Sequence, residues 1–276
     1  MYTFNCRGTL RYVDKPVVMG ILNITPDSFY AESRVTDTGS ILQQAEKMLK
    51  AGAVILDIGG QSTRPGSEKI SAQQELERVL PAIEEVSRHF PECWISIDTY
   101  YASVAKAAVH AGATLVNDIS AGLMDPQMLA AVAQLQVPYI LMHMKGTPQT
   151  MQENPEYNNV TREVMDYFIE RVAACRKAGI TDLILDPGFG FGKSLTHNFT
   201  LLKNLPAFQA LELPVLAGLS RKSMVSKPLK IRTENALNGT TVLNTLALLN
   251  GATLLRVHDV QEAVEAIDLI DIYRKS

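Results

Sequence analysis

The feature that most constrains the fold of this 276-residue chain is a regular alternation of short apolar runs with amphipathic stretches. Most of the runs are continuously apolar, which is typical of parallel strands buried on both faces of a sheet. The sequence predicts eight such strands, at residues 16–23, 53–59, 93–98, 113–118, 137–144, 182–188, 214–221 and 252–259.

The stretches between the runs carry helix signals, namely apolar stripes, N-terminal caps and a closing glycine. The predicted helices are residues 38–51, residues 71–89 with a capping box at Ser71 and Gln74, a segment starting at Asp125-Pro126 with proline as its first helical residue, residues 160–177 closed by Gly179, and a last helix capped by Asp259 and Glu262.

Eight strands alternating with helices predict an α/β fold, the (β/α)₈ TIM barrel, formed by residues 1–276 as a single domain. A doubly wound open sheet has the same alternation and remains the structural alternative. The chain has neither a composition break nor a low-complexity linker that would mark a second domain.

Composition excludes several classes of function. The net charge of −3 and the 20% of charged residues give no reason to expect a nucleic-acid or membrane-surface partner. Three widely spaced cysteines imply neither a disulfide framework nor a zinc site. The first residues lack the order of a signal peptide, and no apolar run reaches the roughly 18 residues of a membrane helix. We therefore expect a cytoplasmic protein.

Polar side chains close most of the apolar runs, and in a barrel these strand ends converge on one mouth. A single Asp or His at such a place is commonly a helix cap, a turn residue or a rim residue. A ring of them is better explained by a polar ligand. The ring comprises Asn23, Asp57, Asp98, Asn117, Asp118, His143, Asp186, Ser220, Arg221, Lys222, Arg256 and His258.

The chemistry of this ring suggests two parts of a ligand. Asp98, Asn117 and Asp186 match a flat, nitrogen-rich ring, because a carboxylate pairs with adjacent N–H donors in a two-pronged fashion. Asn23 offers a neutral oxygen to Mg²⁺, which keeps waters and bridges phosphates. The expected ligand is a polar heterocycle with a diphosphate, whose oxygens would be bound by Arg64, Arg221, Lys222, Arg256 and His258.

Three loops are rich in glycine, proline or small polar residues. "DPGFGFGKS" (186–194) looks like a phosphate loop, but the spacing of a Walker A motif requires glycine where Pro187 stands. We expect Asp186 to point into the barrel and Lys193 to be solvated. "NITPDSFYAESR" (23–34) and "GGQSTRPGSE" (59–68) are expected to be mobile lids.

Seven segments resemble the signature segments of the dihydropteroate synthase family, in the family's order and over nearly the whole chain. They are "NITPDSF", "DIGGQSTRPG", "SIDTY", "VNDISAG", "DPGFGFGK", "GLSRKS" and "RVHDV". The resemblance implies a (β/α)₈ barrel, usually a homodimer. It also implies a transferase of folate biosynthesis, the target of sulfonamides. Such an enzyme condenses 4-aminobenzoate with 6-hydroxymethyl-7,8-dihydropterin diphosphate, giving 7,8-dihydropteroate and diphosphate.

The resemblance also implies a role for each matching residue. The pterin would contact Asp98, Asn117, Ile119, Met142, Asp186, Phe191, Gly218 and Lys222. The diphosphate would be bound by Thr63, Arg64, Ser220, Arg256 and His258, with Asn23 at the Mg²⁺. The 4-aminobenzoate would lie near Phe29, Thr63, Pro65, Lys222 and Ser223. The implied route is SN1-like, and the residues that would act in it are Asn23, Asp27, Lys222 and Arg256.

One departure concerns the first lid, where Tyr30 and Glu32 replace the small residues of many family members. It leaves the lid's conformation open but keeps Asn23 and Asp27. Three other functions remain to be separated from the synthase: a pterin-binding methyltransferase, a non-catalytic paralogue that binds pterins or a protein, and a barrel enzyme with unrelated chemistry.

Overall fold

The computed structural model describes residues 1–24, 38–62, 69–151 and 155–276 and contains an eight-stranded sheet in the order β8-β7-β6-β5-β4-β3-β10-β9. Every pairing within this sheet is parallel. The strands are β3 Val17–Asn23, β4 Ile55–Gly59, β5 Trp94–Asp98, β6 Leu115–Asp118, β7 Tyr139–Met142, β8 Leu183–Asp186, β9 Leu216–Ala217 and β10 Leu254–Val257.

The two ends of this sheet meet. Leu185 of β8 forms a parallel bridge with Val215, and its N–H donates to the carbonyl of Pro214 at 2.9 Å, just before β9. The sheet therefore closes into a barrel, which confirms the predicted TIM barrel and excludes the open sheet.

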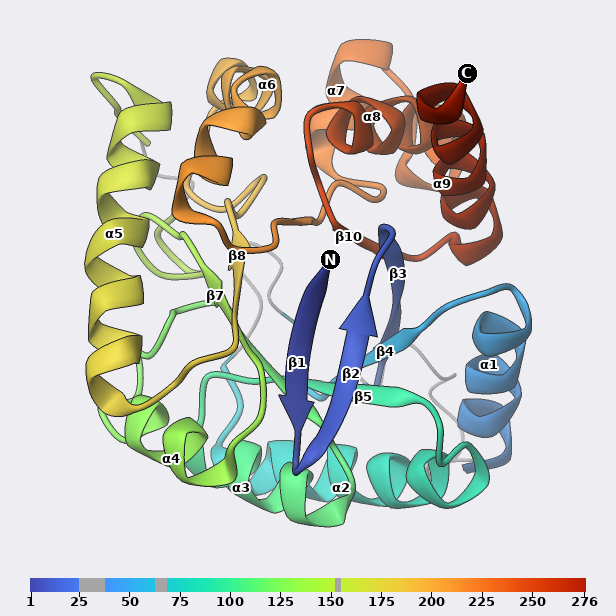
Figure 1. Ribbon diagram of the computed structural model, residues 1–276, viewed down its shortest axis with the longest axis vertical. Helices are drawn as coiled ribbons and strands as arrows, with labels where there is room; N and C mark the ends of the chain where they lie inside the picture. Colours follow the sequence, from blue (N-terminus) through green and yellow to red (C-terminus); the bar gives the residue numbers. More distant parts are fainter. Residues whose placement is uncertain (25–37, 63–68, 152–154) are drawn as a thin grey trace.

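Helices surround the barrel (Figure 1). The helices are α1 Thr38–Lys50, α2 Ala72–His89, α3 Ala102–Ala111, α4 Met128–Leu135, α5 Val160–Ala178, α6 Leu195–Lys203, α7 Ser223–Leu229, α8 Leu237–Leu249 and α9 Val260–Lys275, with 3₁₀ turns η1 Leu205–Leu211 and η2 Thr233–Asn235. None of the helices in the described part of the chain is long and apolar enough to cross a bilayer.

Most predicted helix ends are confirmed, and two are wrong. The capping box is present, since Gln74 N–H donates to Ser71 Oγ at 3.2 Å and Ser71 N–H to Gln74 Oε1 at 2.9 Å. Helix α4 begins at Met128, because Pro126 lies in a turn. Asp259 is the N-cap of α9, but its carboxylate does not cap the helix and instead pairs with Arg221.

A hairpin that the sequence analysis did not predict closes the amino-terminal end of the barrel. Strands β1 (Tyr2–Cys6) and β2 (Thr9–Val13) pair antiparallel and lie across the barrel (Figure 1). Phe4, Cys6 and Val13 belong to one buried cluster with a residue from each barrel strand. Those eight residues are Met19, Ile55, Trp94, Leu115, Ile140, Ile184, Leu216 and Leu254.

The apolar layer above the hairpin fixes which side chains face the mouth. In a strand every second side chain points to the same face. The side chain two residues after each layer residue, or four residues after it in β5, therefore points inward again. The inward positions so reached are Ile21, Asp57, Asp98, Asn117, Met142, Asp186, Gly218 and Arg256. The pleat thus places an apolar plug at one end and polar groups at the other.

Candidate active site

Arg256 joins three strands at the mouth of the barrel. Its Nε donates to Asp57 Oδ2 at 2.6 Å and its Nη2 to Asp98 Oδ2 at 2.6 Å. Asn117 on β6 donates from Nδ2 to the same Asp57 oxygen at 3.1 Å. A guanidinium, two carboxylates and an amide from β10, β4, β5 and β6 thus form one hydrogen-bonded group.

The charges within this group shift the pKa values of Asp98 and Arg256. Burial raises the pKa of Asp98 to about 7, although the Arg256 guanidinium opposes the rise. Burial lowers the pKa of Arg256, but Asp57 and Asp98 outweigh that effect and hold it above its usual value. Arg256 therefore stays charged, and Asp98 is able to accept or to donate a hydrogen bond near neutral pH.

Asp186 and Lys222 form the second charged part of the mouth. Burial raises the pKa of Asp186, and the Lys222 ammonium opposes this rise. Asp186 Oδ1 accepts a hydrogen bond from Gly188 N–H at 2.8 Å. Burial lowers the pKa of Lys222 to about 8. Lys222 donates to the Phe189 carbonyl, and its Nζ lies 4.8 Å from the centre of the Phe191 ring.

The apolar residues expected around the heterocycle also gather here. Ile119 and Met142 are buried in one small cluster with Tyr100, and the partly buried Phe191 packs against it. Gly218 is buried under Lys222, since a side-chain carbon there would lie 3.6 Å from Lys222 Nζ. An apolar surface therefore adjoins the charged groups, as a flat heterocycle with polar edges requires.

Two of the residues expected at the diphosphate contact each other. Ser220 Oγ lies 3.0 Å from His258 Nδ1 and accepts from His258 N–H at 3.1 Å. Arg221, also expected to bind phosphate, instead pairs with Asp259 through Nε at 2.9 Å and Nη2 at 2.7 Å. Its guanidinium also donates to the Glu234 carbonyl at 3.0 Å.

Asn23 ends β3 and is partly buried, and Ser223 is exposed as the first residue of α7, next to Lys222. The described ranges contain no group of three His, Cys, Asp or Glu able to hold a metal ion. A single amide oxygen at Asn23 fits a Mg²⁺ that takes its other ligands from water and diphosphate. Five expected site residues lie outside the described residues: Asp27, Phe29, Thr63, Arg64 and Pro65.

Two residues at the mouth have roles that the sequence analysis missed. Asp57 was noted only as a strand end, but it is fully buried and bonded to both Arg256 and Asn117. Its inward position, two residues after Ile55, was the available signal. Lys193 was expected to be solvated, which is wrong because only 3% of it is exposed.

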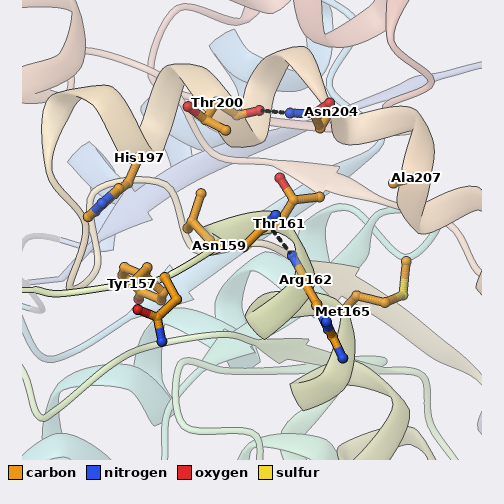
Figure 2. A pocket seen from close by; sticks show the side chains of 11 residues that line it. Tyr157, Asn159, Thr161, Arg162, Met165, His197, Thr200, Asn204 and Ala207 are labelled. Atoms are coloured by element: carbon orange, nitrogen blue, oxygen red, sulfur yellow. Dashed lines mark hydrogen bonds between the residues drawn. The ribbon is translucent and has the colours of Figure 1, made fainter.

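A groove of about 610 Å³ lies outside this mouth, between the start of α5 and helix α6 (Figure 2). Its lining mixes polar side chains with a larger apolar surface, and it contains none of the expected site residues. Two of its residues touch the back of the β8 loop. Tyr157 OH donates to the Gly192 carbonyl at 2.8 Å, and His197 Nδ1 accepts from Ser194 N–H at 3.2 Å.

Comparisons with known proteins identify the family of this chain. The family described as pterin binding enzyme matches residues 19–258. The dihydropteroate synthase of Escherichia coli K12 is 45% identical over 267 residues, which is 96% of this chain and 94% of that protein.

Solved structures agree with the sequence comparison. The Yersinia pestis dihydropteroate synthase in a sulfonamide drug complex has a TM-score of 0.92 at 42% identity and covers 99% of each chain. The Xanthomonas albilineans dihydropteroate synthase in complex with 7,8-dihydropteroate has a TM-score of 0.90 at 38% identity and covers 100% of each chain. This chain therefore belongs to the dihydropteroate synthases, within the family of pterin-binding enzymes.

Proposed function

We propose that the mouth of this barrel condenses 4-aminobenzoate with 6-hydroxymethyl-7,8-dihydropterin diphosphate, releasing diphosphate and giving 7,8-dihydropteroate for folate biosynthesis. The observation that carries this proposal is the convergence of buried Asp98, Asn117 and Asp186 with Lys222 and Arg256. These groups suit a nitrogen-rich heterocycle that carries an anionic leaving group.

In the proposed complex Asp186 accepts two N–H bonds from the guanidine-like edge of the pterin. Gly188 N–H occupies only one acceptor position of Oδ1, so each carboxylate oxygen can still accept one N–H bond from the pterin. Asp98 and Asn117 bond the other polar edge. Ile119, Met142, Phe191 and Gly218 form the walls, and their apolar surface makes the buried polar contacts more selective.

At the diphosphate end Arg256 and His258 neutralise the leaving group, and Ser220 orients His258 through the 3.0 Å contact. Thr63 and Arg64 are proposed to join them from the second loop. When bound beside Asn23, Mg²⁺ would supply further charge neutralisation to the phosphate oxygens. Cations at the leaving group stabilise the transition state, because charge develops there as the C–O bond breaks.

The electron-rich dihydropterin then stabilises the carbocation left at its exocyclic carbon, so an SN1-like course is proposed. Asp27 would stabilise that cation. The amine of 4-aminobenzoate attacks the carbon and loses a proton. It would lie near Lys222 and Ser223, with Phe29, Thr63 and Pro65 contributed by the two loops. The Yersinia relative was solved in a sulfonamide drug complex, which supports sulfonamide binding by this chain, and we place that binding at the proposed aminobenzoate site.

We also propose that the enzyme is a cytoplasmic homodimer. Helix α8 exposes Val242, Leu246 and Leu249, which are 52%, 42% and 46% exposed and lie one helical turn or so apart on one face. A row of this kind is a candidate for contact with a second copy. Sedimentation of the protein and of Leu246→Lys checks this: a dimer that the substitution dissociates is expected.

Diphosphate release by the purified protein tests the proposed reaction. With Mg²⁺ and the dihydropterin diphosphate, release is expected to depend on 4-aminobenzoate and to yield dihydropteroate by mass. If the pterin binds and no diphosphate is released, a pterin-dependent methyltransferase or a non-catalytic paralogue becomes the better assignment. Methyl transfer to a corrinoid acceptor then separates those two.

A further inference from the structure

Lys193, in the glycine-rich loop after β8, is a buried ammonium surrounded by uncharged acceptors. Its Nζ lies 2.9 Å from His143 Nδ1 and donates to the carbonyls of Gly188 at 2.9 Å, Phe191 at 3.0 Å and His143 at 3.2 Å. The salt bridges found among the described residues do not include Lys193. Burying a charge costs free energy unless hydrogen bonds compensate for the lost water, and the four acceptors around Nζ provide that compensation.

The acceptors come from two neighbouring strand ends. His143 directly follows β7 and Met142, whereas Gly188 and Phe191 lie in the loop that follows Asp186. Met142 and Asp186 pair across the two strands, and His143 N–H donates to the Asp186 carbonyl at 2.9 Å. Lys193 thus bonds the residue that follows Met142 and the loop that follows Asp186, and both Met142 and Asp186 are proposed to contact the pterin.

The shape of the loop depends on the same contact. Gly188 has a φ of +67°, and a side-chain carbon there would lie 2.0 Å from the His143 carbonyl oxygen, which is one of the Lys193 acceptors. From the other side, Asn198 of α6 accepts from Gly190 N–H at 2.7 Å and donates to the Lys193 carbonyl at 3.3 Å. The loop is therefore held flush against the end of β7.

His143 is suited to accept from an ammonium. Burial and the Lys193 charge together lower its pKa to about 2, so the ring is neutral, and in the tautomer protonated at Nε2 the Nδ1 atom accepts from Lys193. Four acceptors around one nitrogen suit an ammonium, with three protons to donate, better than an amine with two. Burial lowers the pKa of Lys193 well below its usual value, and the Asp186 carboxylate opposes this. Because three of the four partners are carbonyls that can only accept, we assign Nζ as an ammonium, which places a positive charge near Asp186.

We propose that Lys193 is a positioning residue for pterin binding, which ties the end of β7 to the loop after β8 and so aims Asp186, Met142 and Phe191 at the heterocycle. It does so from behind, without contact with the ligand. This inference rests on the proposed dihydropteroate synthase reaction. It adds a positioning role for a lysine that the sequence analysis expected to be solvated.

Lys193→Met tests the proposal, since it removes the ammonium and keeps most of the side-chain length. Affinity for 6-hydroxymethylpterin is expected to fall about tenfold or more, because hydrogen bonds to a charged group are lost. Affinity for inorganic diphosphate and the KM for 4-aminobenzoate should stay within about twofold, since Lys193 touches neither proposed subsite. Lys203→Met, an exposed lysine on α6, is the matched control and should change none of these.

The pH dependence of pterin affinity distinguishes the positioning role from a general loss of structure around the site. Asp186 is faced by Lys222 at the N-cap of α7, Arg256 from β10 and Lys193 from its own loop, and its charge acts on Asp98 of β5. Each of the three cations favours the Asp186 carboxylate. Without Lys193, Asp186 should take up its proton at a higher pH, so the acid-side loss of pterin affinity should move upward in Lys193→Met.

If Lys193→Met does not fold, His143→Ala keeps the three carbonyl acceptors and should show a smaller loss of the same kind. Equal losses of pterin and diphosphate affinity, or unchanged pterin affinity and pH midpoint, overturn the positioning role while wild-type turnover still supports the synthase. A wild-type protein that binds no pterin removes the proposed function, and this inference with it.

Discussion

Arg256 and Asp57 are 199 positions apart in the sequence, yet the guanidinium Nε and the carboxylate Oδ2 lie 2.6 Å apart inside the barrel. Asp57 is fully buried, and its other oxygen, Oδ1, has no hydrogen-bond partner in the described part of the chain. Asp57 also accepts a hydrogen bond from Asn117. It therefore positions Arg256, which is proposed to bind the diphosphate, and Asn117, which is proposed to bind the pterin.

Asp57→Asn is therefore expected to lower kcat/KM for the pterin substrate by about tenfold or more, since Arg256 loses one of its two carboxylates. Removing one partner of a buried ion pair costs about 3–5 kcal/mol, and this pair should lie at the low end because Asp98 remains. Steady-state kinetics and urea unfolding measure the two effects.

Ser96→Ala is the matched control for Asp57→Asn. Ser96 lies in β5, and its buried Oγ also has no partner among the described residues. Its removal should leave activity unchanged and stability within about 1 kcal/mol. Wild-type kinetics in Asp57→Asn would show that Arg256 is aimed by Asp98 alone.

Asp186→Ala should abolish pterin binding and spare diphosphate binding, because the donors of the heterocycle lose their carboxylate partner. Asp182→Ala is a control at the opposite end of the barrel, just before β8. Asp182 Oδ2 accepts from Asn5 N–H at 2.6 Å and so anchors the hairpin. It should reduce thermal stability and keep pterin affinity. Calorimetric titration with a pterin distinguishes the two, and retained affinity in Asp186→Ala would remove Asp186 from the pocket.

Lys222 predicts an alkaline limit to activity. Burial lowers its pKa to about 8, so the ammonium that faces the substrate is lost as the pH rises through that value. kcat/KM reports the free enzyme and should fall above about pH 8. In Lys222→Arg the fall in kcat/KM should move out of the measurable pH range, because arginine keeps its proton. The maximal kcat/KM of this variant should be lower than that of the wild type. Lys227→Arg, exposed in α7 just after Lys222, should leave the wild-type profile. An unchanged limit in Lys222→Arg would exclude Lys222 as its source.

The barrel could be predicted because its strands are buried on both faces and read as continuous apolar runs. Strand β5 needs no more than "CWISID" to be recognised. The hairpin could not be recognised in this way. Strand β2, "TLRYV", is mostly exposed, so its mixed pattern reads as an ordinary chain start. Its role appears only when the inward layer of all eight strands is known.

The candidate site divides along similar lines. Asp98, Asn117 and Asp186 could be predicted because strand ends converge in any barrel. Lys193 could not, because a lysine between a glycine and a serine normally extends into water. What buries it is His143, 50 residues earlier, and the folded-back carbonyls of its own loop. Local sequence cannot show a contact that depends on two strand ends meeting.

Glu75 gives a prediction about stability. It lies in α2, is 1% exposed and accepts from Thr99 Oγ1 at 3.1 Å, just beyond Asp98. Burial raises its pKa to about 8 from the 4.5 of an ordinary Glu. Between these values the folded protein holds a proton that the unfolded chain has released. Stability should therefore fall as the pH rises through this window, by up to about 1.4 kcal/mol per pH unit.

Glu75→Gln removes this proton and keeps an acceptor for Thr99. The variant should match the wild type near pH 4.5, and it should have the larger free energy of unfolding at pH 8. Urea unfolding across pH 4.5 to 8 measures the difference, and Glu84→Gln, exposed on the same helix, is the control that should leave the wild-type slope. If Glu75→Gln kept the wild-type slope, Glu75 would be ionised in the folded protein. Its charge would then need a partner beyond Thr99, which Arg78 of the same helix is best placed to provide.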